Sequence, residues 1–236
     1  MPKAPATKAS AKRRTAPATP ERDGSKPRER RRKKRDEEVL SAAAKVFAER
    51  GYADASVQDV ADELGILKGS LYHYIRTKED LLFWLLEEAH RDVEEILEAV
   101  AAVEGLNPLE RIELYVRRQV VYNLENLQRV SIYYDDLDRL SDLRRKRIVD
   151  RRAVHDRFIT RLIAEAQEQG LADPTVDAKL LSNCVFATII WTYRWYKPRG
   201  GASRETVVDV CAKYAIGGIT GGPGFIPASG SEFLTK

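Results

Sequence analysis

The 236-residue sequence contains few cysteines and histidines, and this scarcity limits the kinds of site that it can form. The two cysteines, Cys184 and Cys211, lie in apolar helical stretches, which is typical of buried thiols in a reduced, cytoplasmic protein. The three histidines, His73, His90 and His155, lie far from one another and from the cysteines in the sequence. We therefore predict no metal site.

Long apolar runs and strand-like patterns are also missing. No N-terminal apolar segment of the signal-peptide type is present. The most apolar helix that we expect, around residues 180–195, is shorter than a bilayer span and is interrupted by polar residues, so we expect no membrane insertion. No stretch alternates with the two-residue period of a β-strand, and the sequence therefore predicts an all-α fold.

The residue groupings that are typical of enzymes do not stand out. The sequence shows no nucleophile–base pair, no paired acids, no phosphate-binding loop and no set of metal ligands. We therefore predict no catalytic residue and no cofactor, and an enzyme is the least favoured class of function.

Positive charge is concentrated at the start of the chain. Residues 1–35 contain 14 Lys and Arg against 3 Asp and Glu, whereas the whole chain has a net charge of only +4. Because the first 27 residues lack periodicity, we predict that residues 1–35 form a disordered basic arm. The run from Arg28 to Arg35 is either a solvated tail or an arm that contacts DNA. Its place directly before the segment described next favours DNA contact.

Residues 56–82, SVQDVADELGILKGSLYHYIRTKEDLL, are the most informative segment of the chain. Ser56, with Asp59 three residues later, is typical of a helix N-cap, and apolar residues at helical spacing follow. Gly65 stands where a left-handed residue ends such a helix. The pattern predicts a helix, a tight turn and a second helix, which is the layout of a helix-turn-helix that places its second helix in the DNA major groove.

The second helix is predicted from about Lys68 to Ile75. Its exposed side chains would include a cation, a hydroxyl, two phenols and an imidazole, which suit base edges and phosphates. Lys78 stands in the first turn of the next helix, where its positive charge is unfavourable to the helix dipole. A nearby phosphate would explain a lysine at this position better than helix stability does. The predicted DNA-contacting residues are Ser56, Lys68, Gly69, Ser70, Tyr72, His73, Tyr74 and Lys78.

The stretch from residue 47 to residue 82 resembles the N-terminal domain of the TetR family of bacterial transcriptional repressors. The resemblance rests on glycines, aromatic residues and helix caps at fixed offsets, namely Phe47, Gly51, Tyr52, Ser56, Val60, Ala61, Gly65, residues 69–74 and Lys78. Ile75 stands where the family usually has an aromatic residue, and we interpret it as a core substitution. We predict a helix-turn-helix domain over 36–80, a helical ligand-binding and dimerisation domain over 81–220, and a flexible tail over 221–236.

The predicted helices cover about residues 36–50, 57–64, 68–75, 78–103, 108–126, 128–140, 142–169, 176–196 and 204–219. The last two carry apolar residues on more than one face, so each is either buried all round or covered by a partner chain. The resemblance implies that they form a four-helix dimer interface, and the symmetry of helix-turn-helix binding favours a homodimer.

Arg194 lies in a helix otherwise dominated by apolar and aromatic residues. If it is buried, its guanidinium needs a partner, either Asp135 or Asp136 or an anionic ligand. The Arg-Trp-Tyr-Lys-Pro run at 194–198 resembles acyl-CoA-responsive members of the TetR family. The basic patch at 144–152 is either a CoA phosphate site or a solvated face. The predicted ligand-binding residues, which an ordinary aromatic core would also explain, are Arg194, Ile190, Phe186, Tyr133, Tyr122 and Phe158.

These features favour a ligand-responsive repressor. It would bind a near-palindromic, double-stranded DNA operator as a homodimer and be released by a small-molecule effector. The effector is either an acyl-CoA thioester or a hydrophobic ligand without CoA. The alternative is a sequence-independent nucleic-acid-binding protein that relies on its basic arm. Such a protein would bind DNA without discriminating between base sequences.

Overall fold

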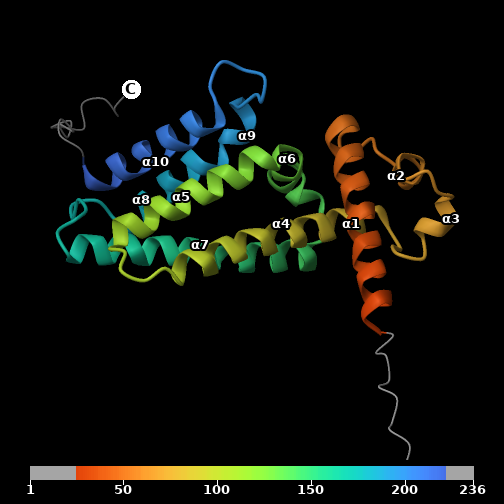
Figure 1. Ribbon diagram of the computed structural model, residues 1–236, viewed down its shortest axis with the longest axis horizontal. Helices are drawn as coiled ribbons and strands as arrows, with labels where there is room; N and C mark the ends of the chain where they lie inside the picture. The colour runs from red at the N-terminus through yellow and green to blue at the C-terminus, as the bar shows by residue number, and fades with distance from the viewer. Residues whose placement is uncertain (1–24, 222–236) are drawn as a thin grey trace, which may run out of the picture. The chain divides into compact units, whose positions relative to one another are not determined.

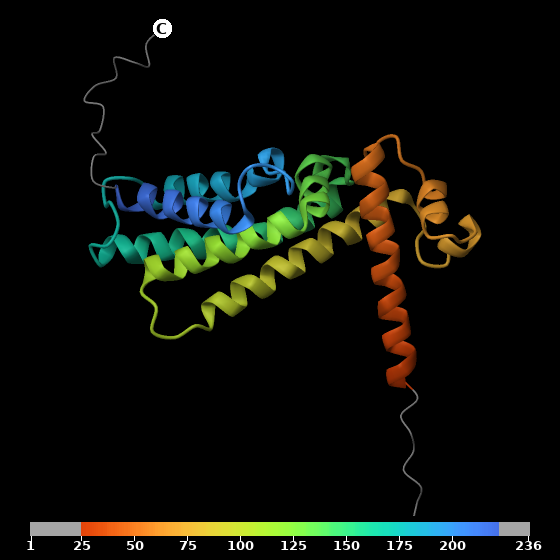
Figure 2. The same ribbon diagram turned by 45° about the horizontal axis from the view of Figure 1, so that its top comes forward.

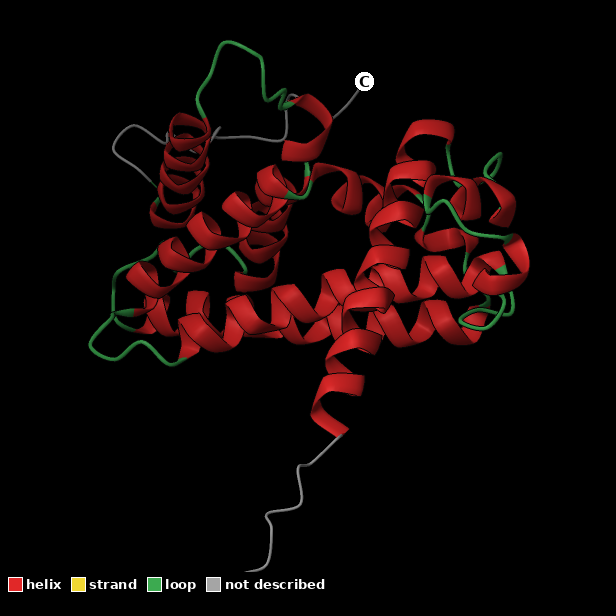
Figure 3. Ribbon diagram, turned by 45° about the vertical axis from the view of Figure 1, so that its right-hand side comes forward, coloured by secondary structure: helices red, strands yellow, loops and turns green. Residues whose placement is uncertain are grey.

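A computed structural model describes residues 25–221, with side chains from Lys34 onward. The elements of this part of the chain are all helical, and no strand occurs among them (Figure 3), which confirms the predicted all-α fold. The helices shown in Figure 1 are α1 (Ser25–Arg50), α2 (Val57–Glu63), α3 (Lys68–Leu71), α4 (Lys78–Ala101), α5 (Pro108–Glu125), α6 (Leu127–Asp135), the 3₁₀ helix η1 (Leu137–Arg139), α7 (Asp142–Glu168), α8 (Ala178–Ile190), α9 (Thr192–Trp195) and α10 (Arg204–Thr220).

The first helix begins earlier than predicted. Residues Ser25–Arg35 were assigned to a disordered arm, but they form the beginning of α1. The stretch is rich in Arg, Lys and Glu, which are good helix formers, and its proline stands in the first turn, where proline is tolerated. It lacks apolar periodicity, so the sequence carried no helix signal there. Residues 1–24 and the tail beyond Gly221 lie outside the described residues, and the disorder predicted for them remains a prediction.

The helix-turn-helix forms as the local signals predicted. Ser56 and Thr77 each cap a helix, and the aspartate three residues later completes a capping box in both cases. Gly65 has φ +64, the left-handed conformation expected at the end of α2. Leu71 and Ile75 are buried, which confirms that Ile75 is a core residue.

Three predicted helices are shorter than expected because their backbone hydrogen bonds change. The helix predicted over 128–140 ends at Asp135, and the 3₁₀ helix η1 follows it. α3 ends at Leu71 because the following amides turn back to carbonyls three residues earlier, as in the bond from Tyr74 N–H to Leu71 O at 2.9 Å. The predicted helix over 176–196 breaks at Trp191, between α8 and α9. There the Ile189 carbonyl accepts hydrogen bonds from the side chains of Asn123 and Thr192.

The chain divides between Arg35 and Asp36 into two units, and the second unit contains two apolar cores. One core joins the helix-turn-helix to the first half of α4 and to α6 and the start of α7. The other lies among the remainder of α4 and helices α5, α7, α8 and α10. The predicted domain border at residue 80 falls in the first turn of α4, and apolar packing continues across it.

Helix α4 packs against α7 (Figure 2), and polar contacts fix their N-terminal ends. Asp80 of α4 pairs with Arg144 of α7. Glu79 accepts hydrogen bonds from the backbone N–H and the hydroxyl of Ser141 at 3.0 and 2.7 Å. The helix that follows the helix-turn-helix is therefore fastened to the body at its first turn.

We expect Gly65→Ala to lower the free energy of unfolding by about 1 kcal/mol, because an alanine at φ +64 is strained. Gly69→Ala is the matched control. Gly69 is helical, and a Cβ added there meets nothing within 4 Å. Urea unfolding followed by circular dichroism measures both variants, and an equal loss in the two would contradict the role assigned to Gly65.

Candidate nucleic-acid interface and ligand cavity

The segment from Lys68 to Tyr74 presents polar and aromatic side chains to solvent. Leu71 is fully buried and anchors α3, while the residues around it are exposed. Tyr72 and Tyr74 are 47% and 38% exposed, which is unusual for such large rings and leaves both phenols free to contact another molecule. The exposed predicted DNA contacts here are Lys68, Gly69, Ser70, Tyr72, His73 and Tyr74. Whether they contact DNA stays a prediction.

Two further predicted DNA contacts have internal partners. The Ser56 hydroxyl donates to Asp59 at 2.7 Å and accepts from the Asp59 backbone N–H. The Lys78 ammonium group donates to three backbone carbonyls of the preceding turn, those of Tyr52, Ala53 and Ala55, at 2.7, 3.1 and 2.8 Å. It also lies 4.4 Å from the centre of the Tyr52 ring. Lys78 therefore has internal partners in the turn before α2, and its contact with a phosphate stays a prediction.

A cavity of about 60 Å³ lies among helices α4, α5, α6, α7 and α8. Its wall consists of Ala89, His90, Val93, Tyr115, Gln119, Tyr122, Asn123, Val130, Tyr133, Tyr134, Arg152, His155, Phe186, Ile189 and Ile190. Tyr133 belongs to the core that contains the helix-turn-helix and also lines this cavity. The cavity therefore lies directly against the packing that supports the DNA-binding segment.

Four of the six predicted ligand-binding residues line the cavity, namely Tyr122, Tyr133, Phe186 and Ile190. Phe158 does not line it and packs on Tyr115 instead, with ring centroids 6.4 Å apart. Arg194 also lies outside, and its side chain is 50% exposed. Of the partners considered for a buried Arg194, Asp135 is found, with its carboxylate 2.5 Å from the guanidinium, but the side chain is not buried. The break at Trp191 ends the apolar helix before Arg194 is reached.

The polar residues of the cavity wall, apart from the tyrosines, were not among the predicted ligand-binding residues. Gln119 Nε2 donates to Asn123 Oδ1 at 3.1 Å, and Asn123 Nδ2 donates to the Ile189 carbonyl. Gln119 Oε1, His90 Nε2 and both ring nitrogens of His155 are buried without a hydrogen-bond partner among the described residues. The four-residue spacing of Gln119 and Asn123 on an amphipathic helix was the one available signal. Unpaired buried polar atoms are costly, so these atoms mark a site for a polar partner.

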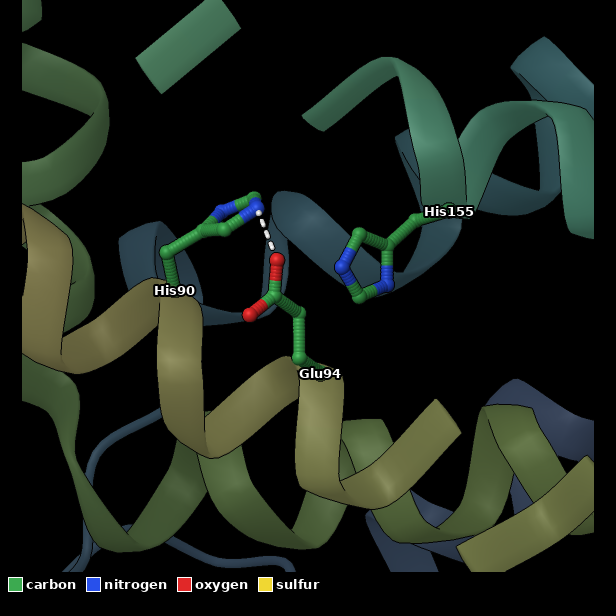
Figure 4. Close-up of side chains that lie close together, drawn as sticks. All are labelled: His90, Glu94 and His155. Atoms are coloured by element: carbon green, nitrogen blue, oxygen red, sulfur yellow. Dashed lines mark ion pairs between the residues drawn. The ribbon is translucent and has the colours of Figure 1, made fainter. Parts of the chain in front are cut away.

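Figure 4 shows that two of the three histidines, distant in sequence, lie together in space. His90 extends from α4 and His155 from α7, with ring centroids 5.2 Å apart. Burial lowers the pKa of His90 and lowers that of His155 to about 4, so both rings are neutral at pH 7. His90 and His155 are therefore far apart in the sequence but close together in the fold.

A wider groove of about 460 Å³ adjoins the cavity between α7 and α8. Arg152, Phe186 and Ile190 line both spaces, so the groove and the cavity share a wall. The Arg152 guanidinium lies 5.7 Å from the centre of the Tyr134 ring and forms no ion pair within the described part of the chain. An exposed cation without a carboxylate partner is thus placed between the groove and the cavity.

Large apolar side chains are exposed on helices α8 and α10 and around the α8–α9 junction. The most exposed are Leu180, Trp191, Val210 and Tyr214, at 58%, 60%, 59% and 73%. Cys184, which was predicted to be buried, is exposed on the same pair of helices, whereas Cys211 is buried as expected. Over residues 25–221, no helix is both long and apolar enough to cross a bilayer.

Comparisons with known proteins agree with this arrangement. The family model described as "Bacterial regulatory proteins, tetR family" matches residues 39–84, and the model described as "Tetracyclin repressor-like, C-terminal domain" matches residues 105–219. The HTH-type transcriptional repressor KstR2 of Mycolicibacterium smegmatis is 34% identical over 218 residues, which cover 87% of this chain and 96% of that protein.

Solved structures show the same fold. A crystal structure of AibR in complex with isovaleryl coenzyme A and operator DNA aligns with a TM-score of 0.71 and 27% identity, covering 76% of this chain and 97% of that one. The structure of KstR2 of Mycobacterium tuberculosis aligns with a TM-score of 0.67 and 31% identity, covering 79% and 95%. Fold and site together define a helix-turn-helix regulator with a helical second domain. The chain belongs to the TetR family of bacterial transcriptional regulators.

We expect Lys78→Met to lower the free energy of unfolding by about 1–3 kcal/mol, because three backbone carbonyls lose their charged donor. Lys68→Met is the control, since Lys68 is exposed and its substitution should change stability by less than about 0.5 kcal/mol. Urea unfolding distinguishes the two. An unchanged midpoint for Lys78→Met would contradict the internal role.

Proposed function

We propose that the protein is a ligand-responsive repressor that acts in the cytoplasm and binds a near-palindromic operator as a homodimer. The observation that carries the proposal is that Tyr133 packs in the core of the helix-turn-helix and also lines the cavity. An occupant of the cavity therefore acts on the packing that positions the DNA-binding segment. The relatives described above are regulators and not enzymes, which supports the same class of function.

In this proposal, the exposed segment around α3 contacts the operator. Its phenols, imidazole and hydroxyl supply donors and acceptors for base edges, and Lys68 supplies a cation for the phosphates. A two-fold dimer would place two such segments in successive major grooves about 34 Å apart. The exposed apolar residues of α8 and α10 are suited to form the dimer contact, because a monomer rarely leaves so many large apolar side chains in water.

The position of the cavity supports a mechanism of release. Side chains of five helices form its wall, so an effector larger than the cavity would displace helices that form that wall. Because α4 carries His90 in that wall and begins at the helix-turn-helix, its displacement changes the spacing of the two DNA-binding segments.

An acyl-CoA thioester is the effector that these spaces fit best. The largely apolar cavity suits an acyl group, and the adjoining groove gives the CoA chain a route to solvent. Arg152 stands between the two spaces and is placed to bind a phosphate or a thioester oxygen. The complex of AibR with isovaleryl coenzyme A supports this class by similarity.

Two alternatives to an acyl-CoA-responsive repressor can be distinguished by experiment. A hydrophobic ligand without CoA would fill the cavity without using Arg152. A sequence-independent nucleic-acid binder would rely on the basic N-terminal residues and would not discriminate between operator and random DNA. The exposed phenols of Tyr72 and Tyr74 favour a sequence-reading protein over this second alternative.

Tyr72→Ala should weaken operator binding by about ten-fold or more, because a half-exposed phenol that contacts a base or phosphate is lost. Its urea midpoint should match that of the unchanged protein. Gel-shift titration against DNA upstream of the protein's own gene, with random DNA as the control, measures the effect. Equal affinity of the variant and the unchanged protein would remove Tyr72 from the interface.

Arg152→Ala should raise the acyl-CoA concentration needed for operator release by about ten-fold, the effect of one charged hydrogen bond, while leaving operator binding intact. Arg194→Ala is the matched control, because Arg194 lies outside both spaces and pairs with Asp135. A panel of acyl-CoAs in the gel-shift assay provides the test. Release that depends on Arg194 and not on Arg152 would contradict the placement. If no thioester releases the DNA, the acyl-CoA proposal is wrong and the repressor proposal stands.

A further inference from the structure

The cluster of His90, Glu94 and His155 is the densest group of metal-ligating side chains in the described residues. His90 and Glu94 lie one turn apart on α4, and His155 faces them from α7 (Figure 4). One ligand atom from each residue lies within 4.8 Å of the other two. His90 Nε2 lies 3.5 Å from Glu94 Oε1. Two histidines and one carboxylate are a ligand set that Zn²⁺ and related ions take in proteins.

The ring nitrogens of this cluster lack the partners that an ordinary buried histidine has. Both nitrogens of His155 and Nε2 of His90 form no hydrogen bond with any described residue, and each side chain is 3% exposed. His90 Nδ1 lies 3.4 Å from the Tyr133 hydroxyl. When Nδ1–H donates to that hydroxyl, Nε2 carries no proton and its lone pair is free to bind a metal ion. A hydrogen bond to the second ring nitrogen is the usual support of a metal-binding histidine.

We propose that His90, Glu94 and His155 bind one divalent transition-metal ion, with Zn²⁺ as the reference ion. Bonds of about 2.0–2.2 Å place tetrahedral ligand atoms about 3.4 Å apart, so His90 and Glu94 are already at the required separation. His155 closes the remaining distance by rotation of its side chain. The inference goes beyond the proposed function, since it does not depend on the effector being an acyl-CoA.

The charges around the cluster are of both signs, and Arg152, which lines the cavity with the two histidines, is a further cation. Arg151 holds Glu94 by two hydrogen bonds, at 3.1 and 2.5 Å, and its positive charge opposes a metal. Glu87 also pairs with Arg151, so two carboxylates face one guanidinium. Arg147, the second partner of Glu87, is 62% exposed and screened by solvent. The hydrogen bonds from Arg151 fix the Glu94 carboxylate, as outer partners of metal-ligating carboxylates do.

Three protein ligands leave the fourth tetrahedral position open, and the cavity lies on that side. Both histidines belong to the cavity wall, so water or an oxygen atom of a bound ligand completes the coordination. A metal ion held in this way joins α4 to α7 at the level of the cavity. The metal ion would therefore fix the spacing of α4 and α7 at the cavity, as the contacts of Glu79 and Asp80 fix it at the first turn of α4.

The test is a titration of chelator-treated, full-length protein with Zn²⁺ in competition with a chromophoric chelator. We expect one Zn²⁺ per chain, and at least a ten-fold weaker affinity in Glu94→Gln and in His155→Phe, which keeps the ring volume. His73→Ala is the matched control, because His73 is the third histidine, is exposed and lies in the helix-turn-helix. Its Zn²⁺ affinity should equal that of the unchanged protein.

Co²⁺ provides a second readout, since its visible absorption reports the coordination geometry. A tetrahedral spectrum that disappears in Glu94→Gln, while that variant retains its circular dichroism, supports the site even if His155→Phe does not fold. Three outcomes overturn the proposal. These are no binding at a ten-fold excess of Zn²⁺, binding that survives both cluster variants, and binding that is lost only in Cys184→Ser, which would assign the metal to a thiol.

Discussion

The rest of the structure depends on the contact between Asp80 and Arg144 at the first turn of α4. Burial alone would raise the pKa of Asp80, but hydrogen bonds from Arg144 and from the backbone N–H groups of Thr77 and Arg76 hold that pKa below its usual range. The ionised carboxylate thus caps α4 and ties it to α7 at once. Replacing Arg144 would leave the Asp80 carboxylate, which is only 8% exposed, without its charged partner. Such a loss costs far more than the loss of an ion pair at the surface.

Helix α4, which this contact fixes at its first turn, is shared by two cores. Its first half packs with the helix-turn-helix, and its later residues pack with α5 and α7. Between these two regions lies the cavity, with Tyr133 on its wall and in the first core. Packed interiors switch between discrete arrangements more readily than they deform, so in the proposed mechanism a change in the cavity would be transmitted along α4 as a shift of the whole helix.

Local features of the fold could be predicted from the sequence, and features that depend on distant contacts could not. Ser56 and Gly65 act through hydrogen bonds or backbone conformation within a few residues, and their predicted roles as helix cap and left-handed turn residue were confirmed. The exposure of Arg194 depends on a helix break to which Asn123, 66 residues from the carbonyl it bonds, contributes. The meeting of His90 with His155 depends on how α4 packs on α7, and no pattern within either helix encodes it.

In the proposed mechanism, the polar groups of the cavity let a ligand distinguish two arrangements of the same helices. His90 is carried by α4, His155 by α7 and Gln119 by α5, so one occupant would reach both Gln119 and the open position of a metal ion held by the two histidines only at one spacing of these helices. Each buried polar atom left unpaired costs about 1–3 kcal/mol, and a preference of about 1–3 kcal/mol is enough to couple two sites. A purely apolar ligand would satisfy none of these polar atoms, so its binding free energy would depend little on that spacing. On this proposal, the polar atoms would determine which occupant shifts the helix-turn-helix, and the apolar wall would determine how tightly that occupant is held.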